Sequence, residues 1–300
     1  MRKIFIFLIV IYFSNTQNTL SDEYQPYIEG QEVENKLVLG KGKYNIPLPL
    51  GKFTVAITHE HRESGAGTKL YSLLLLKLAK DNVMDEAVSV IFSKPTPNYW
   101  NPVKACKRSN FYFIKSYMKG NSQNCWIVNH RTFNFSGDKI KKNSFIGKTR
   151  DYLATKTIKT PNVGVYSNHF YSSPRHKNVY FEIAYVINPE LRGVTSDKTR
   201  NWNESEYLLT RINNYPDKKK FMDSFVKTSA QYQKDLEIGI NVHKDHLLDT
   251  SIINQNKQPS KQLIKSKNIV DELDKLNKLY KSGALSKEEF EKAKKQILSK

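Results

Sequence analysis

The chain has 300 residues, of which 39% are hydrophobic and 12% aromatic, and it carries a formal net charge of +19 at pH 7. The apolar fraction is enough for the core of one ordinary domain with a small appendage, which excludes a chain too polar to fold. The sequence contains neither G-x-G-x-x-G nor G-x-x-x-x-G-K, so neither a Rossmann domain nor a P-loop is supported.

The N-terminal residues have the pattern of a secretory signal peptide. Residues 1–3 are a short basic start, and residues 4–13 are unbroken apolar. A bilayer-spanning helix needs about twenty apolar residues, so this stretch is too short to be one, and we expect cleavage within 16–21. An uncleaved N-terminal anchor is the alternative. The sequence therefore predicts a signal peptide at 1–21 and an exported protein, either periplasmic or secreted.

The body of the chain, residues 22–240, is predicted to be rich in strands. Its first part, 24–42, is polar and expected to be irregular. Residues 70–79 form an apolar run that we interpret as a buried strand, although a helix has the same signature. The segments expected as strands are 52–61, 70–79, 87–92, 111–118, 125–133, 163–171 and 179–187.

Two segments of the body are expected to be helical. Residues 138–155 place Ile146, Tyr152 and Leu153 toward the interior, and residues 204–238 have a helical apolar period with a break near Pro216. Strands interleaved with and followed by helices predict an α+β fold, in which helices cover one face of an antiparallel sheet. A flexible linker and a small C-terminal helical hairpin are expected to follow.

The chain has two cysteines, Cys106 and Cys125. An even pair in an exported protein predicts one disulfide, whereas two free buried thiols are the alternative. If 111–118 and 125–130 form a hairpin, Cys106 lies beyond its far end. The bridge then requires the chain around Cys106 to loop back or to lie on another neighbouring strand.

One short cluster has the composition of a metal site. On a strand, His59 and His61 point to the same face, and Glu63 shares it. Two imidazoles and a carboxylate suit zinc or iron, with water as a further ligand. A solvent-facing polar strand end explains the three residues equally well.

The nucleophile motif G-x-S-x-G does not occur in the sequence. We therefore favour a non-enzymatic protein, and we expect no cofactor. The alternative is an exported hydrolase that acts on a cell-wall or other polymer, because paired acids for glycoside hydrolysis need no sequence motif.

Residues 241–267 have the composition of a flexible linker, and a hairpin of two helices is expected at 268–300. The linker is rich in Asn, Gln, Lys and Ser. In the hairpin, Gly283 is suited to end the first helix, and Ser286 with Glu289 forms a capping box for the second. The residues expected on its apolar face are Val270, Leu273, Leu276, Tyr280, Leu285, Phe290, Ala293 and Ile297.

This hairpin resembles the SHOCT domain, a short C-terminal domain found on many bacterial proteins. The resemblance rests on Leu273 and Leu276, on the turn at 281–285, on the run 286–290, and on the closing residues 297–298. It implies an oligomerising role. So small a hairpin without a disulfide or a metal needs another surface to stay folded. We therefore expect self-association or a protein partner at this segment, with docking on its own body as the alternative.

The positive charge comes mostly from lysines spread along the chain. Readers of nucleic acid favour arginine, so no specific nucleic-acid partner is expected. A solvated surface accounts for most of the charge, and a weak contact with an anionic envelope surface is the further role considered. The sequence thus predicts an exported bacterial envelope protein, basic and non-enzymatic, with a C-terminal segment for oligomerisation or partner docking.

Overall fold

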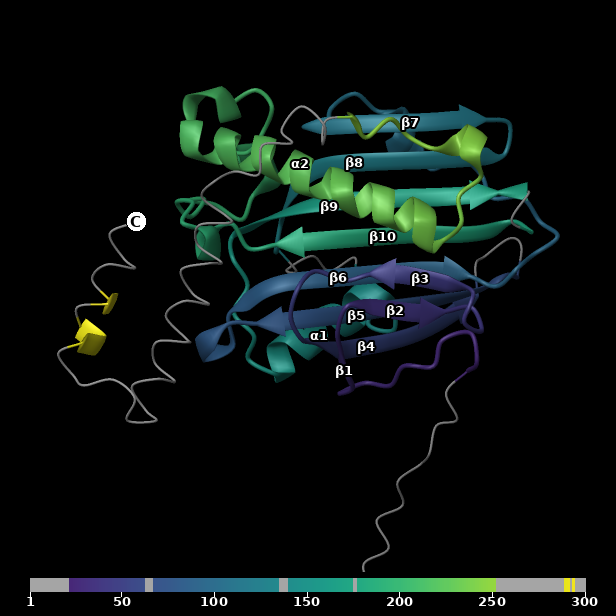
Figure 1. Ribbon diagram of the computed structural model, residues 1–300, viewed down its shortest axis with the longest axis horizontal. Helices are drawn as coiled ribbons and strands as arrows, with labels where there is room; N and C mark the ends of the chain where they lie inside the picture. Colours follow the sequence, from purple (N-terminus) through teal and green to yellow (C-terminus); the bar gives the residue numbers. More distant parts are fainter. Residues whose placement is uncertain are drawn as a thin grey trace, which may run out of the picture.

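The computed structural model describes residues 22–62, 67–134, 140–174, 177–251, 289–291 and 293–294. Within these residues the body is built on an eight-stranded antiparallel sheet with the order β1-β4-β5-β6-β10-β9-β8-β7, and β2 pairs with β3 in a second, two-stranded sheet (Figure 1). The strands are β1 (Glu32–Val33), β2 (Lys36–Leu39), β3 (Tyr44–Pro47), β4 (Phe53–Arg62), β5 (Lys69–Leu78), β6 (Met84–Ser93), β7 (Phe113–Lys119), β8 (Ser122–Thr132), β9 (Val163–Ser173) and β10 (Val179–Ile187). The α+β class with a large antiparallel sheet is thereby confirmed.

The large sheet consists of two runs of consecutive strands. β4, β5 and β6 follow one another on one side, and β7, β8, β9 and β10 do so on the other. The two runs meet where β6 pairs with β10, in a register that sets Phe92 opposite Phe181 and Glu86 opposite Ile187. The expected strands all appear, whereas the prediction of an irregular 24–42 was wrong because β1 and β2 form there.

Two helices pack on opposite faces of the sheet. The long helix α2 (Pro216–Gly239) lies on the same face as β2 and β3, and α1 (Phe145–Thr155) lies on the other (Figure 1). The expected covering of one face therefore holds for α2. The apolar side of α1 packs instead beside Leu74 and Leu76 on the reverse of the sheet, where Leu153 is buried. Ile146, which was expected to face the interior, is exposed.

Local sequence explains where each helix begins and how closely α2 approaches the sheet. The side chain of Ser144 accepts a hydrogen bond from the backbone N–H of Gly147 and so caps α1, and Pro216 occupies the first turn of α2. At the other end of α2, a Cβ at Gly239 would lie 1.9 Å from the carbonyl oxygen of Asn45 in β3. Only glycine allows this contact between helix and strand.

The helix expected over 204–238 forms only in its second half. A short 3₁₀ turn, η5 (Trp202–Glu204), ends at the start of the expected range, and a second, η6 (Ile212–Asn214), lies within its first half. Oδ2 of Asp197 accepts hydrogen bonds from Oγ of Ser205 at 2.8 Å and from the backbone N–H of Glu206 at 2.9 Å. These bonds satisfy the local polar groups outside a helix, so the helical period of the sequence is overridden there.

Residues 241–251, which were expected to begin the linker, pack on the body. His246 is buried, and its carbonyl oxygen accepts a hydrogen bond from Nδ2 of Asn124 at 2.8 Å. The boundary expected at residue 240 therefore falls too early, because Asn124 in β8 and Glu237 in α2 both bind this segment. The rest of the expected linker and the expected signal peptide lie outside the described residues. Of the helices in the described ranges, none is long and apolar enough to cross a membrane.

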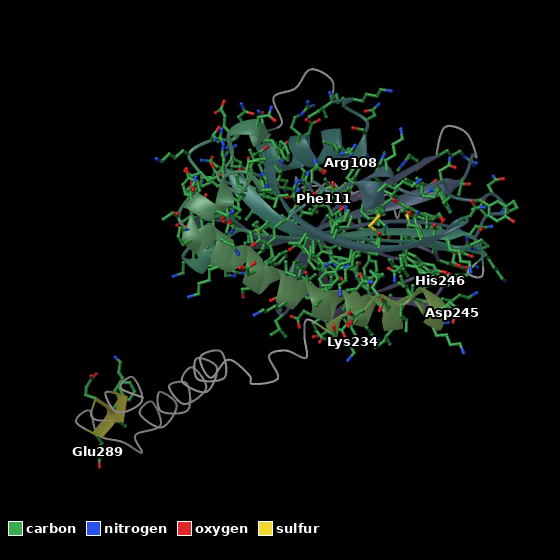
Figure 2. The ribbon with its side chains drawn as sticks, turned by 90° about the horizontal axis from the view of Figure 1, so that it is seen from above. Arg108, Phe111, Lys234, Asp245, His246 and Glu289 are labelled. Atoms are coloured by element: carbon green, nitrogen blue, oxygen red, sulfur yellow. A yellow bond between two sulfur atoms is a disulfide. The ribbon has the colours of Figure 1, made fainter. Side chains whose placement is uncertain are left out.

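The disulfide between Cys106 and Cys125 is present, with the two Cα atoms 5.9 Å apart (Figure 2). Cys125 lies in β8 and Cys106 lies in the short turn η2 (Lys104–Lys107). The backbone N–H of Val103 donates to Oε1 of Gln123 at 2.8 Å, which holds the chain before the turn against β8. The chain around Cys106 thus loops back to β8, which is the first of the two arrangements expected for a bridge from this position.

Candidate functional site

A cavity of about 510 Å³ opens between the sheet and α1. Strands β5, β6, β8, β9 and β10 contribute its floor, and α1 contributes one wall. Its volume is within the range of small-molecule sites in proteins. One side is apolar and is made by Leu74, Leu76, Met84, Ala87, Phe145 and Leu153.

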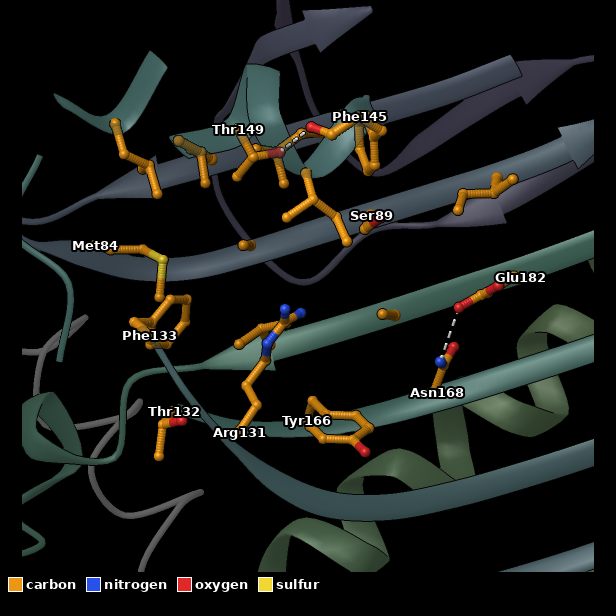
Figure 3. Close-up of a pocket in the computed structure, with 18 of the residues that line it drawn as sticks. Met84, Ser89, Arg131, Thr132, Phe133, Phe145, Thr149, Tyr166, Asn168 and Glu182 are labelled. Carbon is orange, nitrogen blue, oxygen red and sulfur yellow. Dashed lines mark hydrogen bonds between the residues drawn. The ribbon is translucent and has the colours of Figure 1, made fainter. Parts of the chain in front are cut away.

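Arg131, near the end of β8, extends into this cavity beside Phe133 and Tyr166 (Figure 3). It shares a face of the strand with Cys125 and Ile127, because alternate residues of a strand point the same way. The guanidinium carbon lies 5.8 Å from the centroid of the Phe133 ring. No described residue forms a hydrogen bond or an ion pair with this guanidinium, which faces the open space of the cavity.

The charge of the cavity follows from the protonation of its basic groups. The surrounding protein lowers the pKa of Arg131 from its ordinary value, but an arginine starts so far above neutral pH that it stays cationic. Burial lowers the pKa of His130, which also lines the cavity, to about 4. The imidazole is therefore neutral at pH 7, and Arg131 is the lining residue that carries a positive charge.

A carboxylate lies at the other end of the same cavity, away from Arg131 along the strands (Figure 3). Oε1 of Glu182 accepts a hydrogen bond from Nδ2 of Asn168 at 3.2 Å, and Oε2 accepts one from the hydroxyl of Tyr180 at 3.0 Å. Oδ1 of Asn168 is buried and has no hydrogen-bond partner among the described residues. The cavity is therefore polar at both ends along the strands, with opposite charges.

The ring of Phe133 can lie beside Arg131 because the neighbouring strand has a glycine, Gly164, at this point. Gly164 in β9 pairs with Arg131, and a Cβ at Gly164 would lie 2.7 Å from the Phe133 ring and 3.1 Å from Cγ1 of Val186. Glycine at this position allows the ring to lie directly on the sheet. The ring then forms the floor on one side of the guanidinium.

The residues of the predicted metal cluster are only partly described. His59 and His61 do share a face of β4, with their ring centroids 5.3 Å apart in a stacked arrangement, but Glu63 lies outside the described residues. Burial lowers the pKa of His59. Across the described ranges, no group of three or more His, Cys, Asp and Glu side chains is placed to hold a metal ion. The three-residue site stays a prediction.

Most of the predicted association face also lies outside the described residues. Of its eight members, Phe290 and Ala293 fall within the described ranges, where residues 289–291 and 293–294 are helical. These positions belong to the second of the two helices expected from the sequence. The role of the face in association stays a prediction.

Comparison with protein families concerns this C-terminal segment. Residues 271–298 match the family model of the short C-terminal domain SHOCT. The chain carries a SHOCT domain. The resemblance expected at 269–298 is thereby confirmed, whereas no curated protein and no solved structure matches the chain.

Arg131 was not among the functional residues predicted from the sequence. A usable signal was present, because Arg131 continues the alternation of Cys125 and Ile127 on the inward face of the expected strand 125–133. Arg131 is the exposed member of a face on which Cys125 and Ile127 are buried, and an exposed guanidinium can donate to an anionic ligand. The depth and shape of the cavity depend on α1 and on distant strands, and no local pattern gives them.

Proposed function

We propose that the body is a non-enzymatic binding module that takes a small organic molecule into the cavity beside α1. The observation that carries this proposal is the combination of an unpaired, charged Arg131 with an apolar wall in one cavity of about 510 Å³. Arg131 is exposed at the cavity surface, so its donors are available to a ligand. A ligand that supplies both an acceptor for the guanidinium and an apolar surface matches both parts of the lining.

The properties of the lining favour binding over catalysis. With a pKa of about 4, His130 is a weak base at neutral pH, and its ring is stacked on Trp202 with centroids 5.5 Å apart. Both carboxylate oxygens of Glu182 are already occupied by the hydrogen bonds from Asn168 and Tyr180. These groups are arranged to shape a site and to fix its charge.

A neutral fluorescent probe for apolar sites, N-phenyl-1-naphthylamine, tests the binding function. We expect the full mature chain to increase its fluorescence saturably. Ala184→Trp should abolish the increase because Ala184 is on the cavity floor, whereas Ala154→Trp should not because Ala154 is on the exposed side of α1. Circular dichroism checks that both variants are folded. Equal probe binding by the two folded variants would refute a site in this cavity.

The SHOCT domain is proposed to associate with a second copy or with another protein. The apolar face expected at positions such as Leu273 and Leu276 supports this role, because a short hairpin needs another surface to cover it. Light scattering should show a larger mass for the mature chain than for a chain ending at Gln262. Leu273→Asp with Leu276→Asp in the full-length chain should give the same loss of mass. A full-length mature chain that is monomeric in light scattering contradicts the proposal of self-association.

Export is proposed for the same protein. It is supported by the apolar run at 4–13 after a basic start, and by a disulfide, which persists in oxidising compartments. Mass spectrometry of the protein expressed in a bacterium should find a mature N-terminus within 16–22. Weak attraction to an anionic envelope surface is proposed from the net charge of +19, and it should disappear at high salt. An intact N-terminus on a cytoplasmic product would contradict export.

A further inference from the structure

We propose that the cavity takes an amphipathic monocarboxylate, with its carboxylate on Arg131 and its apolar chain against the wall formed by α1, β5 and β6. This inference rests on the proposed binding function and names the class of ligand that the same site selects.

The position of the Arg131 guanidinium determines which chemical group of the ligand it can bind. Arg131 is the cationic side chain of the cavity lining, and its donors face open space because no described residue accepts from them. The planar fork of an arginine matches the two oxygens of a carboxylate. Phe133 and Tyr166 lie on either side of it, so that an anion reaches the guanidinium from within the cavity (Figure 3).

The charges of the lining favour a single negative charge on the ligand. His130 contributes no charge at neutral pH, so Arg131 offers one positive charge to an anion. Glu182, at the far end along the strands, repels a second negative charge. A dianionic head group such as a phosphate monoester therefore fits this cavity less well than a carboxylate does.

The apolar residues determine the direction in which the rest of the ligand lies. Starting from Arg131 in β8, the apolar side continues across the sheet through Val186 to Ala87 and Leu76, which are matched in register across β10, β6 and β5. Phe145 and Leu153 of α1 cover the same region. The polar pair Glu182 and Asn168 lies along the strands instead. An apolar chain attached to the carboxylate therefore lies across the strands and under α1.

Three probes with the same ten-carbon chain separate the contributions of head group and chain. Decanoate, decan-1-ol and decyl phosphate are each used to displace N-phenyl-1-naphthylamine from the full mature chain at pH 8. We expect decanoate to bind more tightly than the other two. In Arg131→Gln, decanoate should bind about ten- to a hundredfold more weakly, as expected for the loss of a charge-assisted hydrogen bond, while decan-1-ol should be unaffected.

The controls address the high charge of the protein and the integrity of the fold. Arg108→Gln removes the same charge from an exposed loop and should leave decanoate binding unchanged. Arg131→Lys should retain part of the affinity. Measurements at 0.15 M and 0.5 M salt identify binding that depends only on net charge, because such binding falls with screening. Thermal unfolding of each variant shows whether the body remains folded.

The outcomes distinguish this inference from the proposed function on which it rests. If the neutral probe and decan-1-ol bind but Arg131→Gln leaves decanoate affinity unchanged, the assignment of a monocarboxylate ligand is wrong. The proposed binding function then remains. Tighter binding of decyl phosphate than of decanoate also overturns the monocarboxylate. If neither the neutral probe nor any ten-carbon ligand binds the folded wild type, both proposals fail.

Discussion

Asn124 of β8 and Glu237 of α2 are joined by a buried hydrogen bond, in which the side-chain amide of Asn124 donates to Oε1 of Glu237 at 2.7 Å. The same oxygen accepts from Nε2 of Gln233 and from the backbone N–H of Leu248, both at 2.8 Å. One carboxylate therefore connects the sheet, the long helix and the segment that follows it. Because burial raises the pKa of Glu237 above its ordinary value, this connection depends on pH.

Replacing Glu237 should change how stability varies with pH. Its pKa is higher in the folded protein than in the unfolded chain, so ionisation is disfavoured by folding. This contribution to the free energy of unfolding is complete at low pH and is lost as pH rises through the raised pKa. Glu237→Gln does not ionise, so its stability relative to the wild type should increase from pH 4 to pH 8. Urea unfolding at several pH values measures this difference, with the exposed Glu34→Gln as control. A constant difference over the whole range would contradict the prediction.

Two buried histidines, His130 and His169, should make the protein less stable as pH falls, which is the opposite of the effect of Glu237. Burial lowers the pKa of His130 and of His169 to about 4 each, whereas an unfolded histidine titrates near 6.5. The stability that they support is complete above pH 6.5 and is lost as pH falls toward 4, by up to about 1.4 kcal/mol per pH unit for each histidine. His169→Gln should reduce this slope by about one proton. The check is urea unfolding between pH 7.5 and 4.5, and equal slopes for His169→Gln and wild type would count against it.

Removing the disulfide should destabilise the body without changing its fold. Cys106 and Cys125 are 19 residues apart in the sequence, and closing a loop of this size stabilises a protein by about 3 kcal/mol in the chain-entropy model. Cys106→Ala with Cys125→Ala should lower the free energy of unfolding by about that amount. Reducing agent should have the same effect on the wild type and none on the double variant. If the reductant leaves the wild-type urea midpoint unchanged under conditions where free thiols appear, the bridge does not stabilise the body.

The buried ion pair of Lys218 and Glu206 should cost much more to break than an exposed neighbour. Nζ of Lys218 lies 2.6 Å from Oε2 of Glu206 and donates to the carbonyl oxygen of Thr195 at 3.0 Å. Lys218→Met leaves Glu206 buried and unpaired, for which we expect about 3–5 kcal/mol of destabilisation. The double variant with Glu206→Gln should recover a large part of this loss, since it leaves no uncompensated charge.

The next residue along the helix provides the matched control for this pair. Lys219 and Asp223 form an exposed i,i+4 pair with an N–O distance of 2.9 Å. Lys219→Met should change the free energy of unfolding by about 1 kcal/mol or less. Similar costs for Lys218→Met and Lys219→Met in urea unfolding would show that burial does not determine the strength of the inner pair.

Local sequence was sufficient for the elements whose residues pack in a simple period. Most of the strands from β4 to β10 and the helix α2 were predicted because apolar residues recur along them at the spacing of their structure, whereas β5 was predicted from a continuous apolar run. The strand β2 was missed, since residues 37–39 are a very short apolar run in a polar stretch, and Leu37 and Leu39 become buried through pairing with β3. The helix expected from residue 204 failed for a related reason, because Asp197 lies outside the window in which a helical period is read.

The candidate site was less predictable than the fold. Cys106 and Cys125 were paired from their number and from the expected compartment alone. Arg131 was not singled out, although its place in the alternation of β8 was available. The cavity around Arg131 is formed by Phe133 together with Gly164 and α1. Gly164 and α1 are distant from Arg131 in the sequence. A period of two residues shows that a side chain points inward, but it does not show whether packed residues or open space surround it.

The pairing of β6 with β10 has a consequence for how the molecule matures. These strands are separated by about ninety residues, so bringing them together carries a large entropic cost and is expected late in folding. The cavity takes its lining from both runs of strands and is incomplete until they join. A molecule that occupies it therefore favours the joined form by mass action.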